Sequence, residues 1–151
     1  MPTHSSVALI TGGTGGIGRA VANKLARLGM HVLVVGRNPD RGEKTVAEIR
    51  AAGDQTDFIS SDRRDAASAR DVAKPAVELG NGHVDILINN AGIYPFGPTL
   101  EMTEELFDRV YSVDVKAPYF LVAELAPLMA NRRKGQSSIY RPWLPITAHP
   151  P

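Results

Sequence analysis

The sequence predicts an α/β fold in which a doubly wound parallel sheet carries helices on both faces. Short apolar runs alternate with amphipathic stretches at the rhythm of βαβ units. A glycine-rich segment, residues 11–18, separates the first apolar run from the first amphipathic stretch. A polar segment, residues 89–92, directly follows a later apolar run. These observations predict parallel strands that are joined by helices.

The first two strands and two helices are predicted from burial and capping signals. Residues 6–10 and 31–35 are short and apolar, as strands buried on both faces are. Residues 16–28 place apolar side chains on one side of a helix, which Gly29 closes. Asn38, followed by Pro39, supplies the N-cap of a second helix that runs to about residue 52.

The middle of the chain repeats this pattern less clearly. Residues 57–60 are predicted as a third strand and residues 65–79 as a third helix, with a last turn disturbed by Pro75. Residues 84–89 form the fourth predicted strand. Residues 93–100 are rich in proline and glycine and are predicted to form a loop.

The chain then becomes helical again and later changes character. Residues 103–134 predict a long helix with a kink near Pro118 and a second distortion at Pro127. Residues 136–151 contain four prolines and no helical period, and they offer at most two or three residues of strand. We therefore expect a domain over residues 1–134 and an irregular proline-rich tail over residues 135–151.

Composition excludes several classes of partner. A net charge of +1 gives no reason to expect nucleic acid or a membrane surface as partner. No apolar run approaches the ~20 residues that cross a bilayer, and the absence of cysteine excludes disulfides. The four histidines lie far apart without metal-ligand spacing, so we expect them at surface or loop positions and expect no metal. A cytoplasmic protein is the default expectation.

The glycine-rich segment has the context of a dinucleotide-binding loop, between a strand and a helix. Gly12 permits a tight turn, Gly16 lets the backbone approach a diphosphate, and Gly18 lets the helix pack closely on the strand. The free N–H groups at the helix N-terminus would then hold the diphosphate. The alternative interpretation is a flexible glycine turn without a ligand.

The end of the second strand indicates which dinucleotide. A carboxylate at this position accepts hydrogen bonds from the ribose hydroxyls of NAD, whereas arginine favours the 2′-phosphate of NADP. The stretch after the strand contains Arg37 and no carboxylate before Asp40. We therefore expect NADP rather than NAD, with an exposed loop charge as the alternative interpretation of Arg37.

These residues resemble the short-chain dehydrogenase/reductase family, in its single-domain branch. The loop 11–18 matches one hallmark of the family and Asn89-Asn90-Ala91-Gly92 the other, and the resemblance covers about residues 5–134. It implies a Rossmann-like fold, an NAD(P) cofactor, and an acidic contact to adenine at Asp62, beside Arg63. The loop also fits the extended sugar-nucleotide epimerase branch through Gly12, Gly15 and Gly18, but the segment 89–92 argues against that branch.

The cofactor contacts expected from the loop, the second strand and the resemblance form one set: Gly12, Thr14, Gly15, Gly16, Ile17, Gly18, Arg37, Asp62, Arg63, Asn89, Asn90, Ala91 and Gly92.

The catalytic half of the family pattern is not found. The family uses a tyrosine with a lysine four residues later, because a phenol with pKa near 10 is a poor base unless a cation lies beside it. No tyrosine here has that lysine, and no serine stands at the end of a recognisable fifth strand. Asp114 occupies the position where the family has an asparagine that holds a water of the proton relay. A tolerated change in an inactive site and a new proton acceptor are the two interpretations of Asp114.

We therefore expect a C-terminally truncated member of the family that lacks its fifth strand. In intact relatives, hydride would pass between NADP and a carbonyl or secondary alcohol, whereas turnover is not expected here. The alternatives are a noncatalytic NADP-binding or interaction fragment and a nonfunctional product of a frame lost near residue 136. The fourth strand would then be an exposed sheet edge, and the helix 103–134 could mediate self-association.

Overall fold

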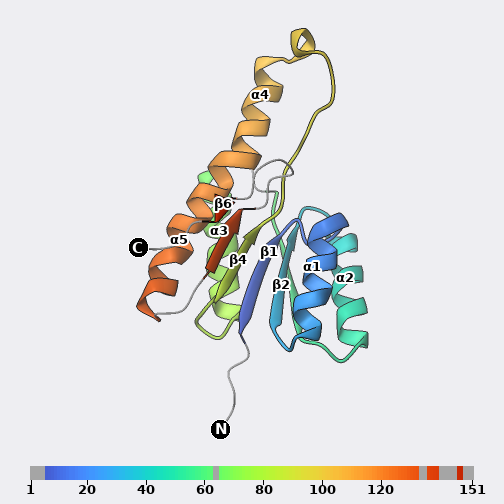
Figure 1. The fold of residues 1–151 in the computed structure, drawn as a ribbon, viewed down its shortest axis with the longest axis vertical. Coiled ribbons are helices and arrows are strands. Elements are labelled where there is room, and N and C mark those ends of the chain that lie inside the picture. Colours follow the sequence, from blue (N-terminus) through green and yellow to red (C-terminus); the bar gives the residue numbers. More distant parts are fainter. Residues whose placement is uncertain (1–5, 63–64, 133–135, 140–145, 148–151) are drawn as a thin grey trace.

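A computed structural model describes residues 6–62, 65–132, 136–139 and 146–147. The described strands form one six-stranded sheet in the order β3-β2-β1-β4-β5-β6, and helices cover both of its faces (Figure 1). The strands β1 to β5 are parallel, and β6 is antiparallel to β5. The predicted doubly wound Rossmann-like α/β fold is confirmed.

The first half of the chain builds one side of the sheet. It contains β1 (Val7–Thr11), α1 (Gly16–Arg27), β2 (His31–Gly36), α2 (Pro39–Ala51) and β3 (Thr56–Ser60). Successive strand residues point to opposite faces, so half of the apolar side chains meet α1 and α2. That core consists of Ile10, Val32 and Val34 from the strands, with Ala22, Ala26 and Ile49 from the helices.

The second half covers the other face. It contains α3 (Ala66–Leu79), β4 (Ile86–Asn89) and α5 (Ala117–Asn131). The alternate strand residues Leu9, Leu33 and Leu87 pack with Val72, Leu121 and Leu125 from α3 and α5. Burial on both faces explains why the central residues of β1 and β2 are apolar. The disturbed last turn predicted for α3 is wrong, because the helix continues past Pro75 to Leu79.

The expectation of a missing fifth strand is wrong for four residues. β5 (Gln136–Ile139) pairs in parallel with β4 along its whole length, from Ile86 opposite Gln136 to Asn89 opposite Ile139. These residues precede the first proline of the tail, so each of their amides can join the ladder. β4 is therefore not a sheet edge. The two residues of β6 (Ile146–Thr147) follow beside β5.

The predicted long helix is divided in the structure. A 3₁₀ turn, η1 (Thr99–Glu101), precedes α4 (Glu104–Tyr111), and the π-helical segment η2 (Ser112–Lys116) joins α4 to α5. Pro118 has no N–H to donate to the carbonyl of Asp114, and its ring crowds that carbonyl. A wider turn directly before Pro118, closed by a bond from the Ala117 N–H to the Ser112 carbonyl, takes the place of a sharp kink. Pro127 lies inside α5 without ending it.

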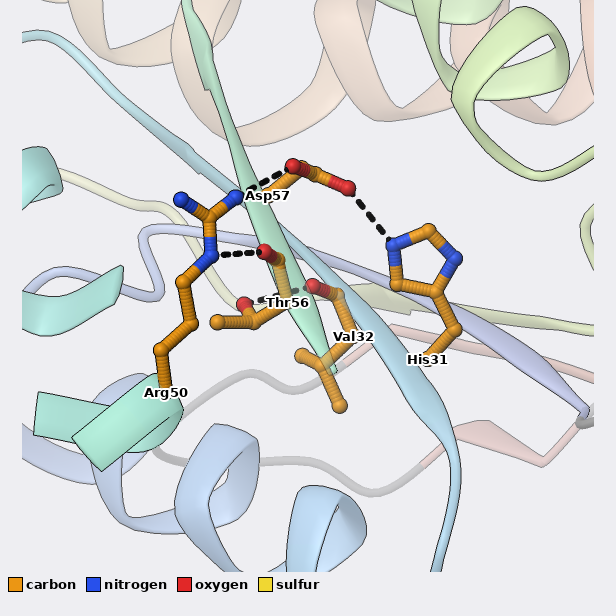
Figure 2. Close-up of polar contacts among 5 residues, drawn as sticks. All are labelled: His31, Val32, Arg50, Thr56 and Asp57. Carbon is orange, nitrogen blue, oxygen red and sulfur yellow. Dashed lines mark hydrogen bonds and ion pairs between the residues drawn. The ribbon is translucent and has the colours of Figure 1, made fainter. Parts of the chain in front are cut away.

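A polar cluster holds β2, β3 and α2 together at the amino ends of the strands (Figure 2). Asp57 bridges two partners: its Oδ2 lies 2.7 Å from His31 Nε2 and its Oδ1 accepts a hydrogen bond from Arg50 Nη2 at 2.6 Å. Arg50 Nε also donates to the Thr56 carbonyl at 3.0 Å. The surface position expected for His31 is wrong, because only 2% of the residue is exposed.

The other three histidines were also expected at surface or loop positions. Two of them cannot be compared with this expectation, and the third is buried in a loop. His4 and His149 lie outside the described residues. His83 precedes β4 and is 3% exposed, with its Nε2 3.3 Å from Asp85 Oδ2. No group of three metal-ligating side chains occurs within the described part of the chain.

Side chains cap three of the helices. Asn38 accepts from the Arg41 amide at the start of α2, and Thr103 accepts from the Leu106 amide at the start of α4. Asp65 accepts from the Ser68 amide at the start of α3, and this hydrogen bond lowers the pKa of the Asp65 carboxyl. Across the described ranges, no helix is both long and apolar enough to span a bilayer.

Candidate cofactor site

The glycine-rich loop connects β1 to α1 at the carboxyl edge of the sheet. Gly12 has a φ of +67°, and a Cβ on it would lie 2.9 Å from the Ala91 Cα, so both its conformation and its surroundings require glycine. Gly16 has a φ of +50° and no atom within 4 Å of its Cβ position. The backbone at Gly16 therefore has open space beside it.

The start of α1 is free of side-chain caps. Gly15, the N-cap, is extended and supplies no side chain, and Gly15, Gly16 and Ile17 are all exposed. An uncapped helix N-terminus presents N–H donors and the positive end of the dipole to an anion. The geometry suits a diphosphate at this point.

Gly18 serves packing rather than ligand contact. It is buried, and a Cβ on it would overlap the Gly12 carbonyl and the Asn90 side-chain nitrogen. The sequence predicted close packing on the strand at this position, whereas the close atoms belong to Gly12 and Asn90. The neighbours of Gly18 are the loop itself and the segment after β4.

The segment Asn89–Gly92 is tied to the end of β1. Asn90 Nδ2 donates to the carbonyls of Thr11 and Gly12 at 3.1 and 3.2 Å. The amides of Asn90 and Ala91 donate to Thr11 Oγ1 at 3.0 and 3.1 Å. Asn89 is buried, and its side-chain amide has no hydrogen-bond partner among the described residues. The segment therefore fixes two strand ends beside the glycine loop.

Thr11 is a site residue that the sequence analysis did not select. It is fully buried, and its hydroxyl accepts the two amide hydrogen bonds and donates to the Ile88 carbonyl at 3.4 Å. The available signal was a hydroxyl residue at the end of an apolar strand. Its partners could not be inferred without the register of β1 and β4.

A cleft of about 240 Å³ opens where these strand ends meet. Seven of the predicted contacts line it: Gly12, Thr14, Arg37, Asp62, Asn90, Ala91 and Gly92. Gly15, Gly16 and Ile17 lie at the exposed start of α1, whereas Gly18 and Asn89 are buried, and none of these five lines the cleft. Arg63 lies outside the described residues.

The remaining wall of the cleft includes residues that were not predicted. Ile93 belongs to the loop after β4, Arg109 to the last turn of α4, and Val113 to η2. The charged side chains on the lining are Arg37, Asp62 and Arg109. A cleft with two guanidinium groups and one carboxylate is suited to a ligand that carries negative charge.

Asp114 connects the loop after β4 to the π-helical segment η2, to which it belongs. Its Oδ1 accepts from the Ile93 amide at 2.9 Å and lies 3.3 Å from the Cβ position of Gly92. An asparagine oxygen could accept the same bond, since amide and carboxylate oxygens are both acceptors. The exchange of asparagine for Asp114 therefore preserves this contact.

Comparison with known proteins gives a consistent result. A family model described as short chain dehydrogenase matches residues 6–137. Sepiapterin reductase of Chlorobaculum tepidum is 40% identical over 136 residues, which cover 85% of this chain and 55% of that protein. Dehydrogenase/reductase SDR family member 2, mitochondrial, of Homo sapiens is 37% identical over 128 residues, which cover 84% of this chain and 45% of that protein.

A solved structure extends the likeness to three dimensions. A metagenomic short-chain oxidoreductase in complex with NADP matches with a TM-score of 0.83 at 33% identity, over 87% of this chain and 59% of that one. The chain thus spans about half the length of the relatives that it matches.

Proposed function

Because the chain belongs to the short-chain dehydrogenase family of oxidoreductases, we propose that its cleft binds NADP, with the adenosine at the carboxyl ends of β2 and β3. The observation that carries this proposal is Arg37, which directly follows β2 and lines the cleft. Its guanidinium forms no ion pair with another described residue. A fork of donors at this position suits a 2′-phosphate, whereas NAD calls for a carboxylate.

The residues present fit the rest of the cofactor. The open backbone at Gly16 and the uncapped start of α1 form a cradle for the diphosphate. We propose that the full predicted set contributes: Gly12, Thr14, Gly15, Gly16, Ile17, Gly18, Arg37, Asp62, Arg63, Asn89, Asn90, Ala91 and Gly92. In this set Gly18 and Asn89 support the loop, and the residues on the cleft wall contact the cofactor.

The reaction proposed for the complete fold is hydride transfer between NADP and a carbonyl or secondary alcohol. The bound nicotinamide would supply or accept the hydride. The 151 residues contain no tyrosine followed four residues later by lysine, so no phenol is activated by that neighbouring cation. We therefore propose that this chain binds NADP without turnover. A domain boundary after residue 134, loss of the reading frame near residue 136 and a cytoplasmic location stay predictions.

Titration with NADPH and NADH, followed by cofactor fluorescence, tests the assignment. Arg37→Ala should weaken NADPH about tenfold to a hundredfold, because a hydrogen bond to a charged group contributes about 1.5–3 kcal/mol. NADH affinity should change little. Arg27→Ala, which removes an exposed arginine of α1 outside the cleft, is the matched control.

Two results would contradict the proposal. Equal losses of NADPH and NADH affinity in Arg37→Ala would show that Arg37 does not recognise the 2′-phosphate. Sustained carbonyl reduction by the purified chain would contradict the absence of turnover.

We also propose self-association through the helical arm, residues 103–134. Phe107 and Tyr111 on α4 and Tyr119 on α5 are each more than half exposed, and exposed aromatic side chains favour a partner surface. Light scattering across a concentration series tests the proposal. Phe107→Asp should shift the population toward monomer. A wild type that keeps the mass of a monomer at all concentrations would refute the proposal.

A further inference from the structure

The cleft contains a cation to which neither the sequence motifs nor the comparisons give a role. Arg109 lies in the last turn of α4 and lines the cleft together with Val113, one helical turn further along. Its guanidinium forms no ion pair with another described residue, whereas Arg19, Arg50 and Arg70 each face a carboxylate. The Arg109 guanidinium is therefore free to meet a ligand in the cleft.

The arm that carries Arg109 is held in place against the cleft. α4 extends beyond the carboxyl ends of the strands (Figure 1). The contact from Asp114 to the Ile93 amide fastens the base of the arm to the loop after β4. Arg109 therefore reaches the cleft from a helix, whereas Arg37 reaches it from the end of β2.

The covalent structure of NADP indicates which part of the ligand lies near Arg109. The 2′-phosphate is carried by the adenosine ribose, so a 2′-phosphate at Arg37 brings the adenine into the same cleft. The diphosphate belongs at Gly16, on the glycine loop. The lining that remains for the base includes Asp62, Ile93, Arg109 and Val113, and Arg109 is the second cation of the cleft.

We infer that Arg109 covers the adenine ring of the bound cofactor, an inference that rests on the proposed NADP site. A guanidinium is planar and stacks on aromatic faces, and every base presents such a face. Val113 offers the ring an apolar contact, and the Asp62 carboxylate offers an acceptor to the exocyclic amine. Arg109 thus contributes to the affinity for both NADPH and NADH, whereas Arg37 discriminates between them.

The two arginines can be separated by titrating wild type, Arg109→Ala and Arg37→Ala with NADPH and with NADH. Arg109→Ala should lose about threefold to tenfold in affinity for each cofactor, because stacking of a cation on an aromatic ring contributes about 0.5–1 kcal/mol at exposed sites and more when desolvated. Arg109→Tyr keeps a planar group without the charge and should recover most of the loss. Arg27→Ala again serves as the control outside the cleft.

Each other pattern would overturn the inference. If Arg109→Ala lowers the affinity for NADPH alone, Arg109 binds the 2′-phosphate. If the affinity for both cofactors is unchanged, Arg109 does not contact the cofactor. Failure of Arg109→Tyr to bind better than Arg109→Ala would exclude stacking. A wild type without saturable binding of either cofactor would overturn the NADP site itself, and the inference with it, and is distinguishable from these results.

Discussion

Replacing Thr11 by valine should lower the stability of this protein, although the two side chains have nearly the same shape. The hydroxyl is fully buried and accepts hydrogen bonds from the amides of Asn90 and Ala91 at 3.0 and 3.1 Å. Valine leaves the Ala91 amide without its acceptor, whereas the Asn90 amide keeps the Ile88 carbonyl at 3.1 Å. A buried donor without an acceptor costs about 1–3 kcal/mol. Thr11→Val should therefore lower the free energy of unfolding by roughly 1–3 kcal/mol, out of a total of about 5–15 kcal/mol for a typical domain.

Urea unfolding followed by circular dichroism measures this loss, with Thr11→Ser as the matched control. Serine keeps the acceptor and removes one methyl group, which costs about 0.8 kcal/mol. NADPH affinity should also fall in the valine variant, because Ala91, whose amide loses its acceptor, belongs to the cleft wall. A Thr11→Val protein within about 0.5 kcal/mol of wild type, or a serine variant that loses as much as the valine variant, would refute this reasoning.

Three further predictions concern other contacts. Asp114→Leu should lose about 1–3 kcal/mol because the Ile93 amide loses its acceptor, whereas Asp114→Asn should lose less; equal losses in urea unfolding would contradict this. Asp57→Ala breaks the contacts to His31 and Arg50 and should lower Tm without changing NADPH affinity, since the cluster lies at the amino ends of the strands; weaker NADPH binding would contradict it. The hydrogen bond from the Ser68 amide lowers the pKa of the Asp65 carboxyl from 3.8. The difference in unfolding free energy between wild type and Asp65→Ala should therefore be complete well above pH 3.8 and vanish as the pH falls through the folded-state pKa. A difference that stays constant down to low pH would contradict this.

The fold was predictable from short-range signals. The central residues of β1 and β2 are buried on both faces and are apolar, and Asn38 and Gly29 lie next to the ends of the helices that they limit. The glycine loop was predictable for the same reason, because its conformation depends on the residues within it. Gly12 and Thr14 of this loop line the cleft, as do five residues expected from the second strand and the family resemblance: Arg37, Asp62, Asn90, Ala91 and Gly92.

Features that depend on pairing between distant segments were not predictable. The role of Thr11 requires the register of β1 against β4, and the burial of His31 requires β3 to bring Asp57 beside it. Arg109 resembles any exposed helix arginine until the π-helical segment and the loop after β4 fix the direction of α4. β5 was missed because four residues before a proline-rich stretch carry too little periodicity to indicate a strand.

The strand order also determines when the cleft can form during folding. β2 and β3 join residues about 24 apart in the chain, as in the bond from Thr56 to Val32, whereas the bond from Asn90 to Thr11 closes a loop of 79 residues. Long closures cost more chain entropy and slow folding, so we expect β4 to dock after β1, β2 and β3 have assembled. In stopped-flow refolding, NADPH fluorescence should therefore develop later than the circular dichroism signal, and simultaneous development would contradict this order. The cofactor then binds only after β4 has docked, so a rising NADPH concentration should stabilise the docked state of this strand.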